Sequence, residues 1–254
     1  SSVMAGHVTL FPVNATLSSY KLLMQRPDFF ASFRVSLLRV LLGVTVNMAL
    51  IMLTAYPLSK KKDQFHGRTA YAWYMILTII FSGGLIPTYL IVKDLGLLDS
   101  MWAVILPGCV SMSNIIIAKT FFSSSIPIEL LEAAQLDGCS NRKYFFNIVI
   151  PLSQAIIAVL CLYYAVGYWN QYFSAMIYLK DREKYTLQLI LREILIEAQA
   201  SEAMTDDLEA AQLQEVSEVL KYALIIVASV PMLILYPFIQ KYFVKGVMIG
   251  SLKG

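Results

Sequence analysis

Five long apolar runs, separated by polar segments, constrain the fold of this 254-residue chain more than any other feature. A helix needs about 20 consecutive apolar residues to cross a bilayer. The predicted spans are residues 33–58, 70–92, 101–122, 147–168 and 219–243. Only 15% of the residues are charged, against roughly a quarter in a soluble domain. We therefore predict an all-α, polytopic transmembrane helical bundle.

Basic residues give the orientation of this bundle. Lysines at 60–62 follow the first run, and Arg142 and Lys143 precede the fourth. Short basic loops remain in the cytoplasm, although residues 60–62 also fit a lipid-binding patch, and the two interpretations are compatible. The long segment 170–218 has too few basic residues for a cytoplasmic loop and is predicted to be external. Because the chain changes sides at each span, the cytoplasmic loop after the first span places residues 1–32 outside as well.

Two of the runs contain helix-breaking residues. Gly83-Gly84 interrupts the second run, which we interpret either as a packing kink, the favoured reading, or as a flexible gate. Pro107-Gly108 is predicted to bend the third run. Shorter helices are predicted outside the spans, over residues 17–24 and 186–200, where apolar residues recur with helical spacing.

Polar side chains also occur within the runs. Arg34 and Arg39 are expected to extend their long stems toward the outer headgroups. Ser111, Ser113 and Asn114 form a polar cluster near mid-membrane depth. Such residues either make ordinary hydrogen bonds between helices or line a path for solute. As a cluster, they are the first candidates for the lining of a passage.

A short charged segment, residues 127–151, separates the third and fourth runs. Pro127 suits the first turn of a helix, and Glu129 lies where the helix dipole favours a carboxylate. Gly138 suits the left-handed residue that follows a helix end, and Ser140 can cap a second helix. The sequence therefore predicts helix 127–139, a sharp bend and another helix at a membrane surface.

Small side chains in this segment suggest a contact. Ala133 and Ala134 follow Glu132 and give a flat face that another protein can approach closely. Asp137 is expected to order the bend through its short side chain. An amphipathic helix that lies at the membrane surface without a partner remains the alternative interpretation.

The segment resembles the EAA motif of the permease subunits of bacterial ABC importers. The matching positions are Glu132-Ala133-Ala134, Asp137-Gly138, Ser140, Phe145, Ile148 and Pro151-Leu152. Further likeness lies in Tyr56-Pro57-Leu58-Ser59, in Gly167-Tyr168-Trp169-Asn170 and in a Gly246…Gly250-Ser251-Leu252-Lys253-Gly254 tail. Departures from the family pattern are Cys139, Ala155 and Val35. The chain is most similar to the carbohydrate-importer branch, with the second maltose permease and the lipopolysaccharide-named permeases of Gram-positive bacteria.

This resemblance implies the type I ABC importer permease fold, in a multi-pass protein of the bacterial plasma membrane. The family has six spans, so we expect the first to precede Ser1 and residues 33–254 to form the permease domain. The helix 127–139 becomes the coupling helix, with Glu132, Ala133, Ala134, Asp137 and Gly138 at the ATPase. The external loop 170–218 is expected to meet the solute-binding protein.

The resemblance also adds candidates for substrate contact. Tyr163, Tyr168 and Trp169 gather at the outer end of the fourth run, where aromatic residues commonly form an interface belt. In a carbohydrate importer, these aromatic rings and Asn170 become candidates for binding sugar rings.

The implied function is import of oligosaccharides or related glycans, driven by ATP. ATP and Mg are expected on a dimer of partner ATP-binding subunits, with no cofactor on this chain. The other expected partners are a second permease, an extracellular solute-binding lipoprotein, the carbohydrate and the lipid bilayer. Two alternatives remain: a permease for a peptide, phosphate or osmolyte, and a membrane scaffold that does not transport.

Catalytic and nucleic-acid-binding functions are not indicated. The sequence has no nucleophile–base arrangement, no Gly-rich phosphate loop and no paired carboxylates within a run. Cys109, Cys139 and Cys161 are scattered, so neither a disulfide nor a metal site is predicted. The net charge of +3 is too small to favour nucleic acid as a partner.

Overall fold

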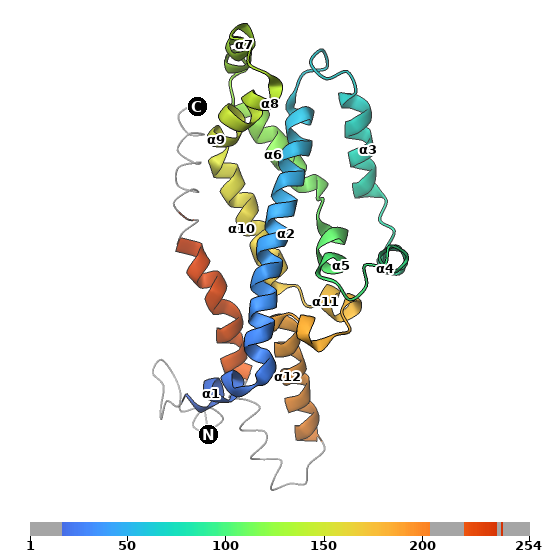
Figure 1. Ribbon diagram of the computed structural model, residues 1–254, viewed down its shortest axis with the longest axis vertical. Coiled ribbons are helices and arrows are strands. Elements are labelled where there is room, and N and C mark those ends of the chain that lie inside the picture. Colours follow the sequence, from blue (N-terminus) through green and yellow to red (C-terminus); the bar gives the residue numbers. More distant parts are fainter. Residues whose placement is uncertain (1–16, 204–220, 238–239, 241–254) are drawn as a thin grey trace. The chain divides into compact units, whose positions relative to one another are not determined.

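The computed structural model describes residues 17–203, 221–237 and 240, and all regular elements within these ranges are helices (Figure 1). The first are α1 (Ser18–Gln25), α2 (Pro27–Ser59), α3 (Arg68–Ile80), α4 (Leu85–Asp94), α5 (Met101–Ile105), η1 (Leu106–Gly108) and α6 (Met112–Ser125). There follow α7 (Ile128–Leu136), α8 (Asn141–Tyr144), η2 (Phe145–Val149), α9 (Ile150–Leu152), α10 (Gln154–Asn170), α11 (Phe173–Tyr178), η3 (Arg182–Lys184), α12 (Leu187–Ala203) and Lys221–Pro237. The predicted all-α class is confirmed.

Within the described residues, α2 is the one unbroken helix that is long and apolar enough to cross a membrane. Three further spans are bent pairs: Arg68–Ile80 with Leu85–Asp94, Met101–Gly108 with Met112–Ser125, and Asn141–Leu152 with Gln154–Asn170. Lys221–Pro237 is a shorter apolar helix, and the ends of the predicted span 219–243 lie outside the described residues. The described residues thus contain up to four spans by length and composition, plus this helix.

The second predicted span is two helices, which meet at an angle of 116°. Gly84 has a φ of +79°, a left-handed value that residues with a side chain rarely adopt. Pro87 cannot donate a backbone hydrogen bond to the preceding turn. Residues 70–92 therefore contain a full break between α3 and α4, sharper than a kink within one helix.

The third and fourth spans are bent as well. Pro107-Gly108 closes the short 3₁₀ helix η1, and the halves on either side of it differ by 58°, which confirms the predicted bend. The fourth span bends by 77° at Ser153, where α9 ends and α10 begins. Pro151 lacks the N–H that a continuous helix needs near this point, and the sequence analysis did not predict the bend.

The chain divides into two compact units, and the boundaries fall after Leu38 within α2, after Tyr168 within α10 and after Leu235 within Lys221–Pro237. One unit contains Arg39–Tyr168 and therefore the segment between the third and fourth spans. Its most deeply buried apolar side chains come from α2, α5, α6 and α10: Ile51, Ala55, Ala103, Ile105, Ile115, Ala118 and Leu160. Small residues in this set allow helices to approach closely, as membrane helices commonly do.

The other unit contains the chain up to Leu38 and Trp169–Leu235. In α12, Leu187, Ile190 and Ile194 are buried, and the spacing confirms the helix predicted over 186–200. The helix α1 likewise confirms the prediction for residues 17–24. Because α2 begins at Pro27, the proposed boundary at residue 32 falls inside a helix, while residues 1–16 and 204–218 lie outside the described residues.

Candidate coupling segment and solute pathway

The helix α7 ends in a bend that is closed by main-chain hydrogen bonds. Gly138 has a φ of +71°, and its N–H donates to the carbonyl of Gln135 over 3.0 Å. The N–H of Cys139 donates to the carbonyl of Ala134 over 2.8 Å. These two bonds form the Schellman motif, in which a left-handed residue follows the helix end. The predicted conformation of Gly138 is confirmed.

The chain enters a second helix directly after this bend. The Ser140 hydroxyl accepts a hydrogen bond from the N–H of Lys143 over 3.3 Å, as predicted for a helix cap. Asp137, by contrast, is exposed, and no hydrogen bond of its carboxylate is found among the described residues. Backbone groups close the bend, and the role expected for the Asp137 side chain stays a prediction.

The exposed side of α7 contains only one of the two alanines. Glu132 and Ala133 are exposed, while Leu131 and Ala134 are buried against the protein. Successive residues of a helix point about 100° apart, so two adjacent alanines cannot share one face. Leu136 is 90% exposed, and α7 lies at the same end of its unit as the loop after α2 (Figure 1). The accessible surface therefore includes Glu132, Ala133, Leu136 and the bend.

The polar candidates for a solute pathway differ in their exposure. Asn114 is buried, Ser111 is half-buried immediately before α6, and Ser113 is exposed. Among the later candidates, Tyr163 is 66% exposed and Asn170 is exposed. The side chains of Ser111, Ser113 and Asn114, predicted as one polar cluster, thus do not share one face.

Tyr168 lies at the centre of a buried polar group, the Tyr168 cluster, formed with Arg39, Gly43, Asn47 and Ile105. The Asn47 amide donates to the Tyr168 hydroxyl and to the Gly43 carbonyl, each over 2.6 Å. The Tyr168 hydroxyl in turn donates to the Ile105 carbonyl over 3.2 Å. These bonds tie α2, α5 and α10 together inside one unit, because each satisfies a buried polar group.

Arg39 belongs to this cluster rather than to the membrane surface. Its side chain is 2% exposed, and its guanidinium lies 5.6 Å from the centre of the Tyr168 ring. A cation over an aromatic face is stabilised by the negative charge of that face. The expectation that Arg39 extends to the headgroups was therefore wrong, whereas Arg34 is exposed.

Trp169 is packed within the other unit. Its indole N–H donates to the carbonyl of Ala228 over 2.8 Å, and its ring meets Phe33 edge to face at 5.8 Å. A buried indole commonly needs such a partner. Tyr168 and Trp169 are thus structural anchors in this conformation, and direct contact with a solute requires that they become accessible.

Sequence reasoning did not single out Asn47, although a signal existed. Asn47 follows Gly43 by four residues, so both lie on one face of α2. A polar residue one turn from a glycine, within an apolar helix, indicates close packing with a hydrogen bond to a neighbouring helix. In the described part of the chain, no group of three or more His, Cys, Asp or Glu side chains can hold a metal ion.

Broken apolar spans, with a short exposed helix and a sharp bend between two of them, define a polytopic helical membrane protein. The match to known proteins agrees: residues 49–249 fit the binding-protein-dependent transport system inner membrane component. The chain belongs to this family, and it is therefore a membrane permease component of an ABC transporter.

Individual relatives extend over nearly the whole chain. It is 42% identical to Protein LplC of Bacillus subtilis (strain 168), over 96% of this chain and 81% of that protein. It is 40% identical to the polygalacturonan/rhamnogalacturonan transport system permease protein YtcP of the same organism, over 99% of this chain and 87% of YtcP. It also resembles the crystal structure of a bacterial ABC transporter involved in the import of the acidic polysaccharide alginate. That likeness has a TM-score of 0.81 and 30% identity, over 95% of this chain and 85% of the other.

Proposed function

We propose that this chain is the permease subunit of an ATP-driven importer for oligosaccharides or related glycans. The names of two relatives support the solute class, since YtcP is named for polygalacturonan and rhamnogalacturonan and the structural relative for alginate. Both names denote acidic polysaccharides, so uronate-containing oligosaccharides are the first solutes to test. The chain has no catalytic role in this proposal, and partner subunits hydrolyse ATP with Mg.

The exposed bend after α7 is the observation that carries the mechanism. A dimer of ATP-binding subunits would receive Glu132 and Ala133, and closure of that dimer would move α7 as a lever. Gly138 gives the lever its shape, because its φ of +71° sets the direction of the chain into α8. A rigid bend transmits motion, whereas a flexible one would absorb it.

A second permease and an extracellular solute-binding lipoprotein complete the proposed transporter. The passage would form between the two permeases, with Ser111, Ser113 and Asn114 on this chain as its first lining candidates. Tyr163, Tyr168, Trp169 and Asn170 would lie toward its outer end. The loop 170–218 would meet the binding protein as it releases its glycan.

Uptake into proteoliposomes tests the proposal. The permease is reconstituted with the second permease, the ATP-binding subunits and the binding protein, and uptake of labelled solutes is measured with and without ATP. We expect ATP-dependent uptake of oligogalacturonides or other oligosaccharides. Uptake of a peptide, phosphate or an osmolyte instead would contradict the solute class, and failure of the chain to assemble with any ATP-binding subunit would contradict the role as a permease.

A further inference from the structure

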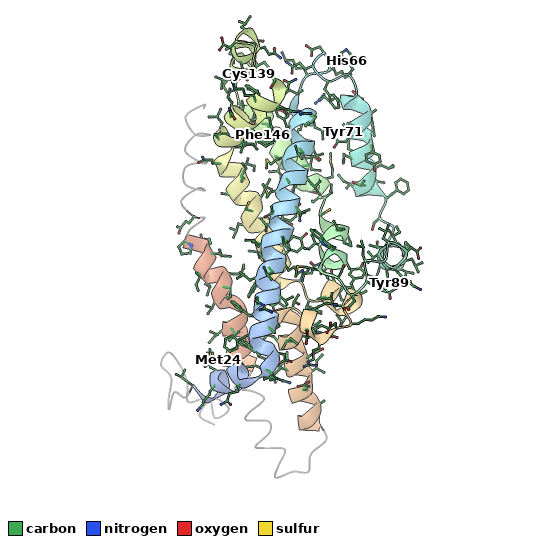
Figure 2. All side chains as sticks on the ribbon, viewed as in Figure 1. Met24, His66, Tyr71, Tyr89, Cys139 and Phe146 are labelled. Atoms are coloured by element: carbon green, nitrogen blue, oxygen red, sulfur yellow. The ribbon has the colours of Figure 1, made fainter. Side chains whose placement is uncertain are left out.

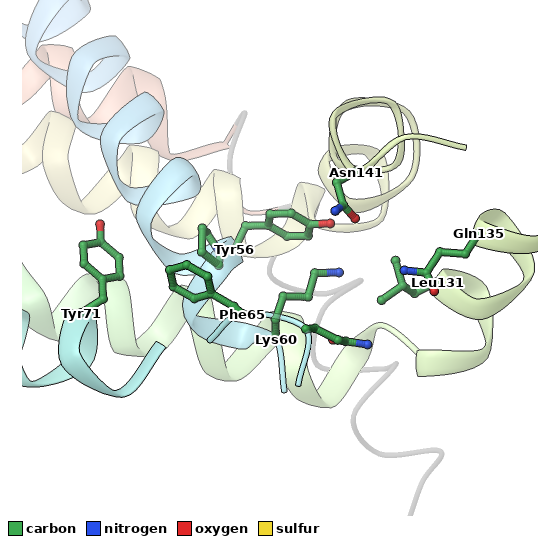
Figure 3. A pocket seen from close by; sticks show the side chains of 9 residues that line it. Tyr56, Lys60, Phe65, Tyr71, Leu131, Gln135 and Asn141 are labelled. Atoms are coloured by element: carbon green, nitrogen blue, oxygen red, sulfur yellow. The ribbon is translucent and has the colours of Figure 1, made fainter. Parts of the chain in front are cut away.

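A cavity of about 450 Å³ lies beside α7, between the end of α2 and the start of α8. We name it the Lys60 pocket. Its polar lining residues are Tyr56, Lys60, Gln64, Tyr71, Gln135 and Asn141. Figure 3 shows the ends of Lys60, Tyr56 and Asn141 turned toward a common space, with Leu131 and Gln135 of α7 opposite. The volume suits a small ligand.

The lining of this cavity carries one positive charge and no carboxylate. Among the described residues, no acidic side chain lies within ion-pair distance of Lys60. Glu129 lines a neighbouring cavity that shares Lys60 but does not line this one. A cation without an acidic partner, surrounded by neutral donors, is the arrangement that recognises an anion.

Lys60 is also partly withdrawn from water. Its amine lies 4.4 Å from the centre of the Tyr56 ring and 5.0 Å from that of Tyr144. Burial lowers the pKa of Lys60 from its ordinary 10.5 to about 8, because the charged form loses solvation. The two ring faces occupy only part of the ammonium surface, and its three N–H groups need acceptors that the rings supply poorly.

The Tyr56 hydroxyl supplies a second unsatisfied group. Its oxygen is buried and has no hydrogen-bond partner within the described residues. A buried polar atom without a partner costs about 1–3 kcal/mol, so native proteins commonly satisfy it with water or a ligand. Tyr56 and Lys60 lie one helical turn apart at the end of α2, and both line the pocket.

We propose that the Lys60 pocket binds a phosphate ester. A phosphate offers several strong acceptors to the ammonium, the hydroxyl and the amide groups. Two sources share this chemistry: the headgroup of an anionic phospholipid, and a soluble phosphorylated metabolite. The pocket follows directly on a membrane span, at the level where basic sites meet lipid headgroups.

A ligand here would regulate coupling. It would join the loop after α2 to Leu131 and Gln135 of α7, and so hold the helix on its own unit while the exposed face remains accessible. The inference is independent of the solute, because a permease for any solute would have the same pocket. Failure to transport a glycan would therefore leave this proposal intact.

The test uses the assembled transporter in nanodiscs of phosphatidylcholine. Calorimetry measures binding of glycerol 3-phosphate, and native mass spectrometry measures retention of phosphatidylglycerol that is added to the discs. The proposal requires that at least one of the two binds. Binding of the soluble probe identifies a metabolite site, and selective retention of phosphatidylglycerol identifies a headgroup site.

Three variants locate the ligand. Lys60→Gln should weaken binding at least about tenfold, the loss expected for one hydrogen bond between charged groups. Asn141→Asp keeps the side-chain size but turns a carboxylate toward the phosphate, and should weaken binding by a similar factor. Lys62→Gln is the matched control, since Lys62 is exposed and lies outside the pocket lining, and should change binding less than about twofold.

Several outcomes would overturn the proposal. It would be overturned if neither probe binds the unaltered transporter, or if Lys60→Gln and Lys62→Gln weaken binding equally. Loss of the ATP-binding subunits from the Lys60→Gln transporter, with phosphate binding absent throughout, would also overturn it and would identify a protein carboxylate as the partner of Lys60.

Discussion

Two glycines in the same unit show two different uses of a missing side chain. Gly138 has a φ of +71°, and a Cβ atom built there would have nothing within 4 Å. A Cβ atom on Gly43 would lie 2.6 Å from the Tyr168 ring. Gly138 thus serves the shape of the backbone, and Gly43 provides space. The bend after α7 depends on backbone conformation, whereas the Tyr168 cluster depends on close packing.

The largest effect is expected from Gly138→Val. A β-branched residue resists a positive φ, so the bend should change direction or lose its order. We expect ATP-driven transport to fall at least about tenfold while ATP hydrolysis continues. A strain of about 1.4 kcal/mol in the native bend is enough to reduce the population of that conformation tenfold. Parallel assays of uptake and phosphate release in proteoliposomes measure this uncoupling.

Gly138→Asn is the matched variant for the same position. Asn tolerates the left-handed conformation better than other residues with side chains. It should retain most of the transport that Gly138→Val loses. Normal transport by both variants would show that the bend does not transmit motion. Equal failure of both would show that any side chain at position 138 disturbs the bend, whatever its tolerance of a positive φ.

The second prediction concerns the charge on the exposed face of α7. Glu132→Lys should weaken attachment of the ATP-binding subunits, because it reverses a charge at the proposed contact. We expect less than half of the normal ATPase in mild-detergent purification, with an unchanged melting temperature of the permease. Asp94→Lys, which reverses an exposed carboxylate at the C-terminal end of α4, is the control. Equal co-purification of all three proteins would count against Glu132 as a contact.

Gly43→Ala should affect stability rather than coupling. The added methyl group meets the Tyr168 ring inside the packed interior, and such overpacking costs about 1–3 kcal/mol. Thermal unfolding of the purified permease should show the loss. Gly167→Ala is the control, because a Cβ atom there has nothing within 4 Å. A Gly43→Ala protein as stable as the control would show that the cluster repacks freely.

Tyr168→Phe removes only the hydroxyl of the cluster. Asn47 and the Ile105 carbonyl then lose a buried partner, and we expect a loss of about 1–2 kcal/mol in unfolding free energy. Tyr163→Phe, at a position that is 66% exposed, should change stability by less than about 0.5 kcal/mol. Equal effects at the two positions would contradict the assignment of Tyr168 as a structural anchor.

The smallest effect is expected from pH at Lys60. The pKa of Lys60 is about 8 in the folded protein and 10.5 ordinarily. Methylation of the Lys60 amine by an amine-reactive reagent should therefore reach half its maximal rate near pH 8. The folded state disfavours the charged form, so the contribution of Lys60 to stability rises from pH 8 to 10.5 and is lost as the pH falls. A midpoint near 10.5 would show that Lys60 is solvated.

Local rules predicted the bend after α7, because the conformations of Gly138 and Ser140 depend on near neighbours. Gly138 and Ser140 adopt the conformations that their residue types favour, and α12 follows from the spacing of its apolar residues. The short turn after α7 needs no distant contact to form. Such features can be read from a single sequence.

Packing inside the units could not be predicted in the same way. An arginine near the end of an apolar run can contact either a lipid headgroup or the face of an aromatic ring. Arg39 contacts a ring because Tyr168 lies beside it in the fold, which the sequence does not show. The Gly83-Gly84 pair permits both a kink and a full break, and in the structure the helices on either side of it meet at 116°. The burial of Ala134 rather than Ala133 likewise depends on what lies beside α7.

Cys139 offers the most direct test of the central claim, that the bend after α7 meets the ATP-binding subunits in the cytoplasm. This thiol follows Gly138 and is partly exposed, and Figure 2 labels it beside α7. A membrane-impermeant maleimide should label Cys139 in inside-out vesicles but not in intact cells, and the bound ATP-binding subunits should slow that labelling. Labelling of Cys139 from outside intact cells, or labelling in inside-out vesicles that the ATP-binding subunits do not affect, would contradict the account.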